Sequence, residues 1–322
     1  MRHLAMYNGH GCADVALANL GLIPEVTFST EIDARACAIA NYRHPHTVQL
    51  GDAFEADYTK LGHIDLLTGG SPCTYWTIAQ TSHRETTCDG FGYALFMQYV
   101  RALRESKATY FLYENNASMS KCIKAAITKE LGVEPIFVDS AIVSAQHRER
   151  LYWTNIPGAH VVPTQDLCIA DILEEHVDEL YYTYKPAEMY KTVRISRANT
   201  CRSGRFDRHQ SGRIFDTTHK SPALCTSKSS IGFYRMADGR LRNLTPVECE
   251  RLQQLPDGYT DVPGISPTAR YHAIGNGWTI GVIEQLLAPL VELLGHVPLS
   301  GQSDCASAQE LCTSSIDSGS NI

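Results

Sequence analysis

Three short polar segments carry the residue types from which covalent catalysis can be built. Residues 69–73 read Gly-Gly-Ser-Pro-Cys and follow directly on the apolar run 64–68. A second apolar run, 110–113, ends in Glu-Asn at 114–115, and a third segment reads Gln-His-Arg-Glu-Arg at 146–150. A cysteine on a turn stiffened by proline can act as a nucleophile. Together with an acid and two guanidinium groups, it suggests covalent catalysis on an electron-poor ring.

Each of these residues also has an ordinary structural explanation. An isolated cysteine such as Cys73 is more often a small buried hydrophobe, and Glu114 could be a plain carboxylate at a strand end. Arg148 and Arg150 alternate with Glu149 on an extended segment, so both are expected to point to one face. There they could hold a ring oxygen and a phosphate, or form a surface ion pair with Glu149. The hypothesis depends on the conjunction of all four residues.

The first part of the chain, residues 1–160, alternates between strand-like and helix-like patterns. Such alternation predicts an α/β fold with a mostly parallel sheet that is covered on both faces. In such sheets the ligand site lies at the carboxyl ends of the strands, where the three polar segments are expected to meet. We expect strands near residues 3–7, 25–30, 47–50, 64–68, 110–114, 134–140 and 151–155, and helices near 13–20, 33–42, 92–106 and 119–131.

The remainder of the chain is predicted to form three further parts. Between 161 and 244 the pattern weakens into polar, glycine-containing stretches, which indicates a small, irregular lobe. Helical periodicity returns in 245–296, first after Thr245-Pro246 and then in one long helix over 279–294, and these helices are predicted to pack on the first domain. The tail 297–322 is rich in Ser, Gly and Gln and is predicted to be disordered.

Composition indicates an ordinary globular protein. The 322 residues are 43% apolar and 20% charged, and no run of eighteen apolar residues occurs. The N-terminus lacks the pattern of a signal peptide, so we expect a cytoplasmic protein without a membrane span. None of the eleven cysteines forms a Cys-x-x-Cys pair, which predicts reduced thiols and neither a disulfide framework nor a metal site.

The charge is unevenly distributed along the chain. Net charge is −7, but Lys185 to Arg242 holds 13 Lys or Arg against 4 Asp or Glu, a local balance of +9 that leaves −16 elsewhere. A basic segment inside an acidic protein is typical of a polyanion site, although a solvated basic face is the alternative. The residues considered for DNA contact are Arg84, Arg202, Arg205, Arg208 and Arg213. Arg208 is the candidate for reading bases.

The loop after the first predicted strand has features of a cofactor site. It contains Tyr7, Gly9 and Gly11, and glycines allow the backbone to turn sharply and approach a ligand. Glu31 ends the second strand, where a carboxylate can bind a ribose diol, and Asp52 ends the third. No complete Gly-x-Gly-x-x-Gly or phosphate-binding loop is present. S-adenosylmethionine, which has no phosphates, is therefore favoured over a nucleotide cofactor. The alternative for Glu31 is that it is a plain surface charge.

Taken in the order in which they occur along the chain, the segments from Met6 to about Leu287 resemble the conserved blocks of the cytosine-5 DNA methyltransferase family, of the prokaryotic or phage type. YNGHG resembles the cofactor loop, STEID the ribose block and GDA the adenine-edge block. GGSPC, FLYENN and QHRERLYW are similar to the catalytic blocks, and RNLTPVECERLQQLPDGY and AIGNGWTIGVIEQLL to the last two. The basic lobe and the tail are unmatched. The resemblance implies a Rossmann-like S-adenosylmethionine-dependent sheet and a target-recognition lobe at 161–244.

The resemblance also implies roles for individual residues. Cys73 would be the nucleophile, Glu114 the partner of ring N3, and Arg148 and Arg150 the arginines that hold the base. Cofactor contacts would come from Tyr7, Gly9, Gly11, Glu31, Ile32, Asp52, Leu95 and Asn276. The sequence departs from the family pattern at Ile32, Thr74, Asn116 and Gly277-Trp278, which all concern the surroundings of the methyl group and the base.

The predicted activity is methyl transfer to carbon 5 of a flipped-out cytosine in double-stranded DNA, by a monomeric enzyme associated with the nucleoid of a bacterial or phage-infected cell. Residues 74–92, with His83, Arg84 and a Gly90-Phe91-Gly92 hinge, are expected to form a mobile loop that closes over the base. The alternatives are methylation of tRNA, use of a non-standard methyl donor, a non-enzymatic DNA-binding homologue and a nicotinamide oxidoreductase.

Overall fold

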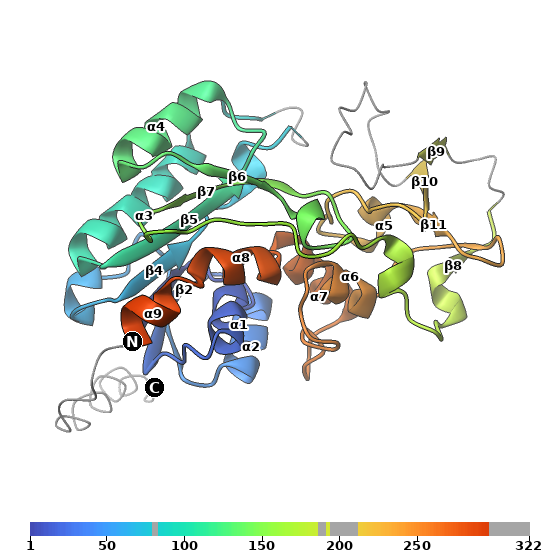
Figure 1. The fold of residues 1–322 in the computed structure, drawn as a ribbon, viewed down its shortest axis with the longest axis horizontal. Helices are drawn as coiled ribbons and strands as arrows, with labels where there is room; N and C mark the ends of the chain where they lie inside the picture. The colour runs from blue at the N-terminus through green and yellow to red at the C-terminus, as the bar shows by residue number, and fades with distance from the viewer. Residues whose placement is uncertain (79–82, 186–190, 194–211, 296–322) are drawn as a thin grey trace, which may run out of the picture.

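The computed structural model describes residues 1–78, 83–185, 191–193 and 212–295. Figure 1 shows a larger α/β unit, built mainly from the first half of the chain, and a smaller lobe beside it. Arg202, Arg205 and Arg208 and the predicted tail 297–322 lie outside the described residues. Within these ranges, no helix is both long and apolar enough to cross a membrane.

The larger unit contains a seven-stranded sheet with the order β3-β2-β1-β4-β5-β7-β6. Neighbours from β3 to β5 run parallel, whereas β7 runs antiparallel to both β5 and β6. The α/β fold class with a mostly parallel sheet is confirmed. The strands are β1 (Arg2–Met6), β2 (Val26–Thr30), β3 (Thr47–Gly51), β4 (Leu66–Gly69), β5 (Tyr110–Asn116), β6 (Ile136–Asp139) and β7 (Glu149–Thr154).

Strand order reverses between β1 and β4, and this reversal places the loops that carry chemistry next to each other. From β1 the chain proceeds outward to β2 and β3, and it then returns to β4 on the other side of β1. The loop after β1 therefore lies beside the turn after β4. Open α/β sheets bind their ligands at such a switch point, outside the carboxyl ends of the strands.

Alternate residues of the central strands enter two separate cores, as the two-residue period of a strand requires. Leu67 and Tyr113 pack with α3 (Phe91–Ser106) and α4 (Lys121–Leu131) on one face. Leu66 and Leu112 pack on the other face with α1 (Cys12–Asn19), α2 (Ala34–Arg43) and α8 (Ile280–Leu287). Each face of the sheet is thus covered, and the strand ends are held in a fixed relation.

The smaller lobe has its own sheet and core. Five short strands have the order β8-β12-β11-β10-β9, and Phe215 and Tyr234 lie at the centre of a third apolar cluster. The lobe is more regular than its sequence indicated. Its elements are β8 (Tyr182–Thr183), β9 (Lys191–Val193), β10 (Arg213–Asp216), α5 (Lys228–Ile231), β11 (Phe233–Arg235) and β12 (Leu241–Arg242).

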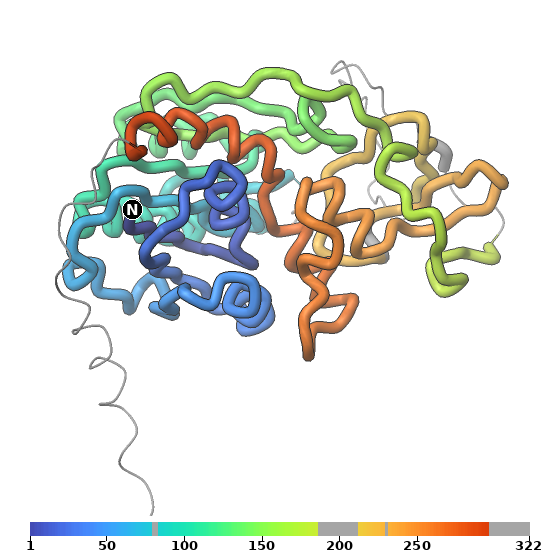
Figure 2. The backbone as a smooth tube through the Cα atoms, turned by 60° about the horizontal axis from the view of Figure 1, so that its bottom comes forward, coloured from blue at the N-terminus to red at the C-terminus, as the bar shows by residue number. Residues whose placement is uncertain are grey.

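The helices after the lobe differ from expectation in three respects. First, α6 (Pro246–Leu252) contributes to the core of the lobe and α7 (Pro267–Asn276) to the cores of both the lobe and the larger unit, and the two helices lie between them (Figure 2). Second, α7 was not predicted, although Ser266 caps it. Third, the expected helix 279–294 is divided into α8 and α9 (Leu290–Gly295) at Pro289, since proline lacks the amide hydrogen that a helix interior needs.

Candidate active site

The turn that carries Cys73 depends on two glycines at the end of β4. A Cβ at Gly69 would lie 2.9 Å from the carbonyl oxygen of Met6, and one at Gly70 would lie 2.8 Å from that of Glu114. Any larger residue would therefore push β4 away from β1 or β5. The short 3₁₀ turn Cys73–Tyr75 follows, with Pro72 at its N-cap. The glycines thus bring the thiol-bearing turn close to the end of β5.

Side chains at the end of β5 hold this turn. Asn115 Nδ2 donates to the carbonyl oxygen of Ser71 at 3.0 Å, and Ser71 Oγ lies 2.7 Å from the hydroxyl of Tyr113. Asn116 Nδ2 donates to the carbonyl oxygen of Cys73 at 3.4 Å. The departure from the family pattern at Asn116 therefore has a structural use, since it anchors the backbone of the cysteine itself.

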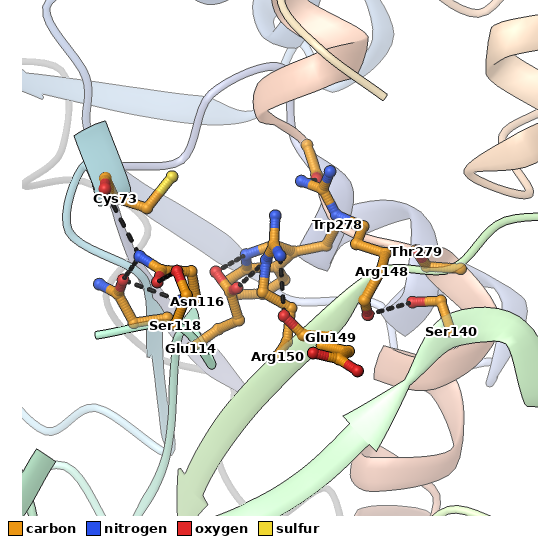
Figure 3. A network of polar contacts seen from close by, with 12 residues as sticks. Cys73, Glu114, Asn116, Ser118, Ser140, Arg148, Glu149, Arg150, Trp278 and Thr279 are labelled. Carbon is orange, nitrogen blue, oxygen red and sulfur yellow. Dashed lines mark hydrogen bonds and ion pairs between the residues drawn. The ribbon is translucent and has the colours of Figure 1, made fainter. Parts of the chain in front are cut away.

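Glu114 lies between donors from two other segments (Figure 3). Its Oε1 is 2.8 Å from Nε of Arg150, and its Oε2 accepts a hydrogen bond of 2.9 Å from the indole nitrogen of Trp278. The carboxyl group is largely buried, so these contacts fix its orientation. Cys73, Glu114 and Arg150 belong to three different segments, and the structure brings them to the same edge of the sheet.

The guanidinium of Arg148 contacts the backbone around the end of α7. Its guanidinium is buried and donates to the carbonyl oxygens of Gly275 and Gly277 at 3.1 and 2.7 Å. Burial lowers the pKa of Arg148, and the neighbouring charge of Arg150 lowers it further. Arg150 thus faces the acid, whereas Arg148 fastens the end of α7 to the residues before β7. That both arginines hold the base stays a prediction.

Neighbouring groups hold the segment that contains these arginines. Asp139, at the end of β6, accepts hydrogen bonds from His147 Nδ1 at 2.7 Å and from the backbone nitrogen of Arg148 at 2.9 Å. Burial raises the pKa of Asp139, but these hydrogen bonds outweigh burial and leave the pKa below its ordinary value. Gln146 Nε2 donates to Gln253 Oε1 at 2.8 Å, which ties the same segment to the chain after α6.

The loop after β1 has the geometry of a ligand loop. Tyr7 adopts a φ of 54°, which is uncommon for a residue other than glycine, and its hydroxyl donates to the carbonyl oxygen of Leu95 at 2.7 Å. Gly9 donates its amide hydrogen to Glu31 Oε2 at 2.9 Å. Gly11 has a φ of 91°, and a Cβ there would lie 2.9 Å from the ring of His44. Glycine is therefore required at position 11.

The other predicted cofactor residues surround this loop. Ile32 follows Glu31 and is 76% exposed, so its side chain is open to a ligand. Asp52 accepts from the backbone of Phe54, whose exposed ring stacks on Phe91 with centroids 5.8 Å apart. An exposed apolar surface beside a carboxylate that can accept further hydrogen bonds fits an adenine and a ribose. Asn276 is exposed at the end of α7.

The described part of the loop 74–92 is fastened to the body of the protein. The guanidinium of Arg84 donates to the carbonyl oxygens of Trp76 and Ser118. Glu85 accepts from the backbone nitrogen of Gly92, where a Cβ would lie 2.7 Å from the indole nitrogen of Trp76. The expected hinge at Gly90-Phe91-Gly92 is instead a packed junction at the start of α3. Arg84 has an internal role that its sequence context did not reveal.

Part of the basic segment is also used internally. Arg242 forms a buried bidentate pair with Glu248, and Lys220 donates to the carbonyl oxygens of Ser144 and Leu167. Arg240 pairs with Asp238 and Glu179 at the surface. The local balance of +9 therefore overstates the charge available to a polyanion. Arg213 lies at the start of β10.

Two site residues were not selected from the sequence. Trp278 stands out in the sequence only as a departure from the family pattern, and Gln253 donates to the carbonyl oxygens of Ile274 and Gly277. No local signal identifies either, because their partners are distant in the chain. Seven described cysteines, Cys12, Cys37, Cys73, Cys88, Cys122, Cys168 and Cys249, form no disulfide. In the described ranges no three His, Cys, Asp or Glu side chains are grouped so that they could hold a metal ion.

Comparison with known proteins identifies the class to which this fold and site belong. The family model of C-5 cytosine-specific DNA methylases matches residues 1–292. The chain belongs to this family. The fold is also shared with the Entamoeba histolytica methyltransferase EhMeth, at a TM-score of 0.69 and 15% identity, over 91% of this chain and 98% of that chain.

Two curated relatives are a phage and a bacterial methyltransferase. The chain is 27% identical over 287 residues to the orphan methyltransferase M.SPRI of Bacillus phage SPR, a match that covers 71% of this chain and 64% of M.SPRI. It is 25% identical over 294 residues to the type II methyltransferase M.NlaX of Neisseria lactamica, over 84% of this chain and 90% of M.NlaX. The chain thus spans less than two thirds of the length of M.SPRI.

Proposed function

We propose that this protein transfers a methyl group from S-adenosylmethionine to carbon 5 of cytosine in double-stranded DNA. The observation that carries the proposal is the grouping of Cys73, Glu114 and Arg150 at one edge of the sheet, in a chain of the cytosine methylase family. Glu31, Ile32 and the loop 7–11 would hold the methyl donor. When bound, S-adenosylmethionine supplies an electrophilic methyl group on a sulfonium.

The side chains account for the activation of the base. The thiolate of Cys73 forms a bond to carbon 6 of the cytosine, and the electron pair of the 5,6 double bond moves into the ring. Glu114 donates a proton toward ring N3, and Arg150 holds both the carboxyl group and the ring oxygen. Carbon 5 thereby becomes nucleophilic. After methylation a base removes the proton on carbon 5, the 5,6 double bond forms again as the bond between carbon 6 and sulfur breaks, and the thiolate leaves. N3 returns its proton to Glu114, which restores the acid.

The second lobe is proposed to bind the DNA. Residues 161–244 would recognise the target sequence, while the flipped cytosine enters the site on the larger unit at an unstacking cost of about a few kcal/mol. The basic segment supports this assignment, since contacts to phosphates need positive charge. Arg202, Arg205, Arg208 and Arg213 of this segment would supply these contacts.

Transfer of tritium from labelled S-adenosylmethionine tests the proposal. Purified protein is incubated with duplex DNA, with tRNA or with neither, and we expect label in the DNA alone. Cys73→Ser should reduce the rate below detection because a hydroxyl is far less nucleophilic than a thiolate. The exposed Cys122→Ser serves as the matched control and should retain full activity.

Two results would contradict the proposal. Label in tRNA but not in DNA would assign the same chemistry to a different nucleic acid. Turnover by Cys73→Ser within tenfold of the wild-type rate would exclude the covalent mechanism. Duplex DNA with 5-fluorocytosine at the target adds a direct readout, since the ring has no proton on carbon 5 to lose. The wild type should then form a covalent complex that withstands denaturation.

A further inference from the structure

Trp278 contacts the catalytic acid from a distant part of the chain. The indole nitrogen donates to Glu114 Oε2 at 2.9 Å, although the two residues are 164 positions apart (Figure 3). We infer that Trp278 is a positioning residue, which fixes the orientation of the Glu114 carboxyl group toward the base. This inference rests on the proposed function, in which Glu114 acts on ring N3.

The backbone on both sides of Trp278 is held rigidly. The carbonyl oxygen of Gly277 accepts from Arg148 at 2.7 Å and from Gln253 at 3.2 Å. Thr279 Oγ1 donates to Gln253 Oε1 at 2.9 Å. These hydrogen bonds hold the backbone of Trp278 in place. A residue that positions another side chain needs a backbone held in this way.

The same segment also contacts the loop that would hold the methyl donor. The backbone nitrogen of Trp278 donates to Cys12 Sγ at 3.3 Å. A Cβ at Gly277 would lie 2.4 Å from the ring of His10, so only glycine permits this approach. The pair Gly277-Trp278, which departs from the family pattern, therefore connects the loop after β1 to the acid at the end of β5.

The two oxygens of the Glu114 carboxyl group face donors from different segments of the chain. An indole N–H donates and cannot accept, so Oε2 of Glu114 must act as the acceptor in this contact. Oε1 makes no hydrogen bond within the described ranges, although it lies 2.8 Å from Nε of Arg150. Oε2 is held by Trp278 and Oε1 faces Arg150, so the two contacts together hold the carboxyl group in one orientation.

Kinetics of Trp278→Phe test the positioning role. Phenylalanine retains an aromatic ring but lacks the donor, so kcat for methyl transfer should fall by about tenfold or more. The KM values for DNA and for S-adenosylmethionine should stay within threefold of wild type. Trp153→Phe is the matched control, because the Trp153 indole donates to Thr128 far from the site. Its kcat should be unchanged.

Two kinetic outcomes would overturn the inference. A kcat for Trp278→Phe within threefold of wild type would show that the contact does not matter for the reaction. A loss of kcat accompanied by an equal loss of substrate binding would show that Trp278 only maintains the shape of the site.

Indole N–H resonances of the free protein test the contact without any substrate. The chain has three tryptophans. Their peaks are assigned from Trp278→Phe or, if that variant does not fold, by elimination from Trp76→Phe and Trp153→Phe. Glu114→Gln should move the Trp278 peak and leave the other two in place. An unmoved Trp278 peak would overturn the inference. If the wild type methylated neither DNA nor tRNA, the proposed function would fail, whereas the peak shift would still report the contact.

Discussion

Replacing Arg148 and Arg150 in turn should separate stability from catalysis. Arg148 is only 5% exposed, and its guanidinium donates to two carbonyl oxygens. In Arg148→Met the carbonyl oxygen of Gly277 keeps its bond from Gln253, whereas that of Gly275 loses the guanidinium. A buried carbonyl without its partner costs about 1–3 kcal/mol, and a bond to a charged donor contributes about 1.5–3 kcal/mol. Since removal of a buried cation also relieves a desolvation cost, we expect a net loss of about 2–4 kcal/mol of unfolding free energy.

Arg150→Met should instead lower kcat more than it lowers the unfolding free energy. The side chain is 14% exposed and Glu114 keeps its hydrogen bond from Trp278, so the unfolding free energy should fall by less than in Arg148→Met. Its loss removes a donor that orients the acid and the ring oxygen. We therefore expect kcat to fall on the order of a hundredfold, the scale measured when one donor to a developing charge is removed.

Urea unfolding followed by circular dichroism gives the stability of each variant, and tritium transfer at low temperature gives kcat while both remain folded. The reasoning would be refuted if Arg148→Met unfolded at the same urea concentration as the wild type. Equal losses of stability in the two variants would refute it as well, since they would show that burial does not distinguish the two arginines.

Three further predictions concern other charged groups. Glu248→Gln should lower the unfolding free energy by about 3–5 kcal/mol, as measured by urea titration, because it leaves the buried Arg242 charge without its partner. In Asp139→Asn the unfolding free energy should depend less on pH in the acid range. The lowered pKa of Asp139 stabilises the wild-type fold above about pH 4, and this contribution is lost as the pH falls through the folded pKa. An unchanged pH profile would contradict this. Neutralising Arg202, Arg205, Arg208 and Arg213 together should weaken DNA binding and reduce its salt dependence. Unchanged affinity at 100 mM salt would indicate that the basic segment is a solvated face.

Most elements of the larger unit could be predicted because their signals are local. An apolar run of strand length, such as 64–68 or 110–113, indicates a buried strand wherever it occurs, and the period of α3 indicates a helix. A local sequence signal also marks the start of α7: Ser266 is a capping residue that accepts from the backbone of Ala269, and Pro267 follows it. Pro289 likewise marked the division between α8 and α9.

The roles of individual site residues could be predicted only in part. The motif types and the resemblance indicated Cys73, Glu114 and the arginines. Alternation along an extended segment placed Arg148 and Arg150 on one face, but it could not show that the carbonyl groups of α7 would occupy the space in front of Arg148. Net charge similarly could not show that Arg242 would be buried against Glu248.

The sequence by itself determined the class of fold, the turn that carries Cys73 and the family, because each of these is encoded by neighbouring residues. Only the tertiary structure decided that Trp278 contacts Glu114, that Arg148 supports the scaffold and that Arg84 fastens its loop. The physical reason is that periodicity and turn chemistry depend on residues a few positions apart. Contacts between distant residues depend instead on how the helices and the two sheets pack together, which no local pattern specifies.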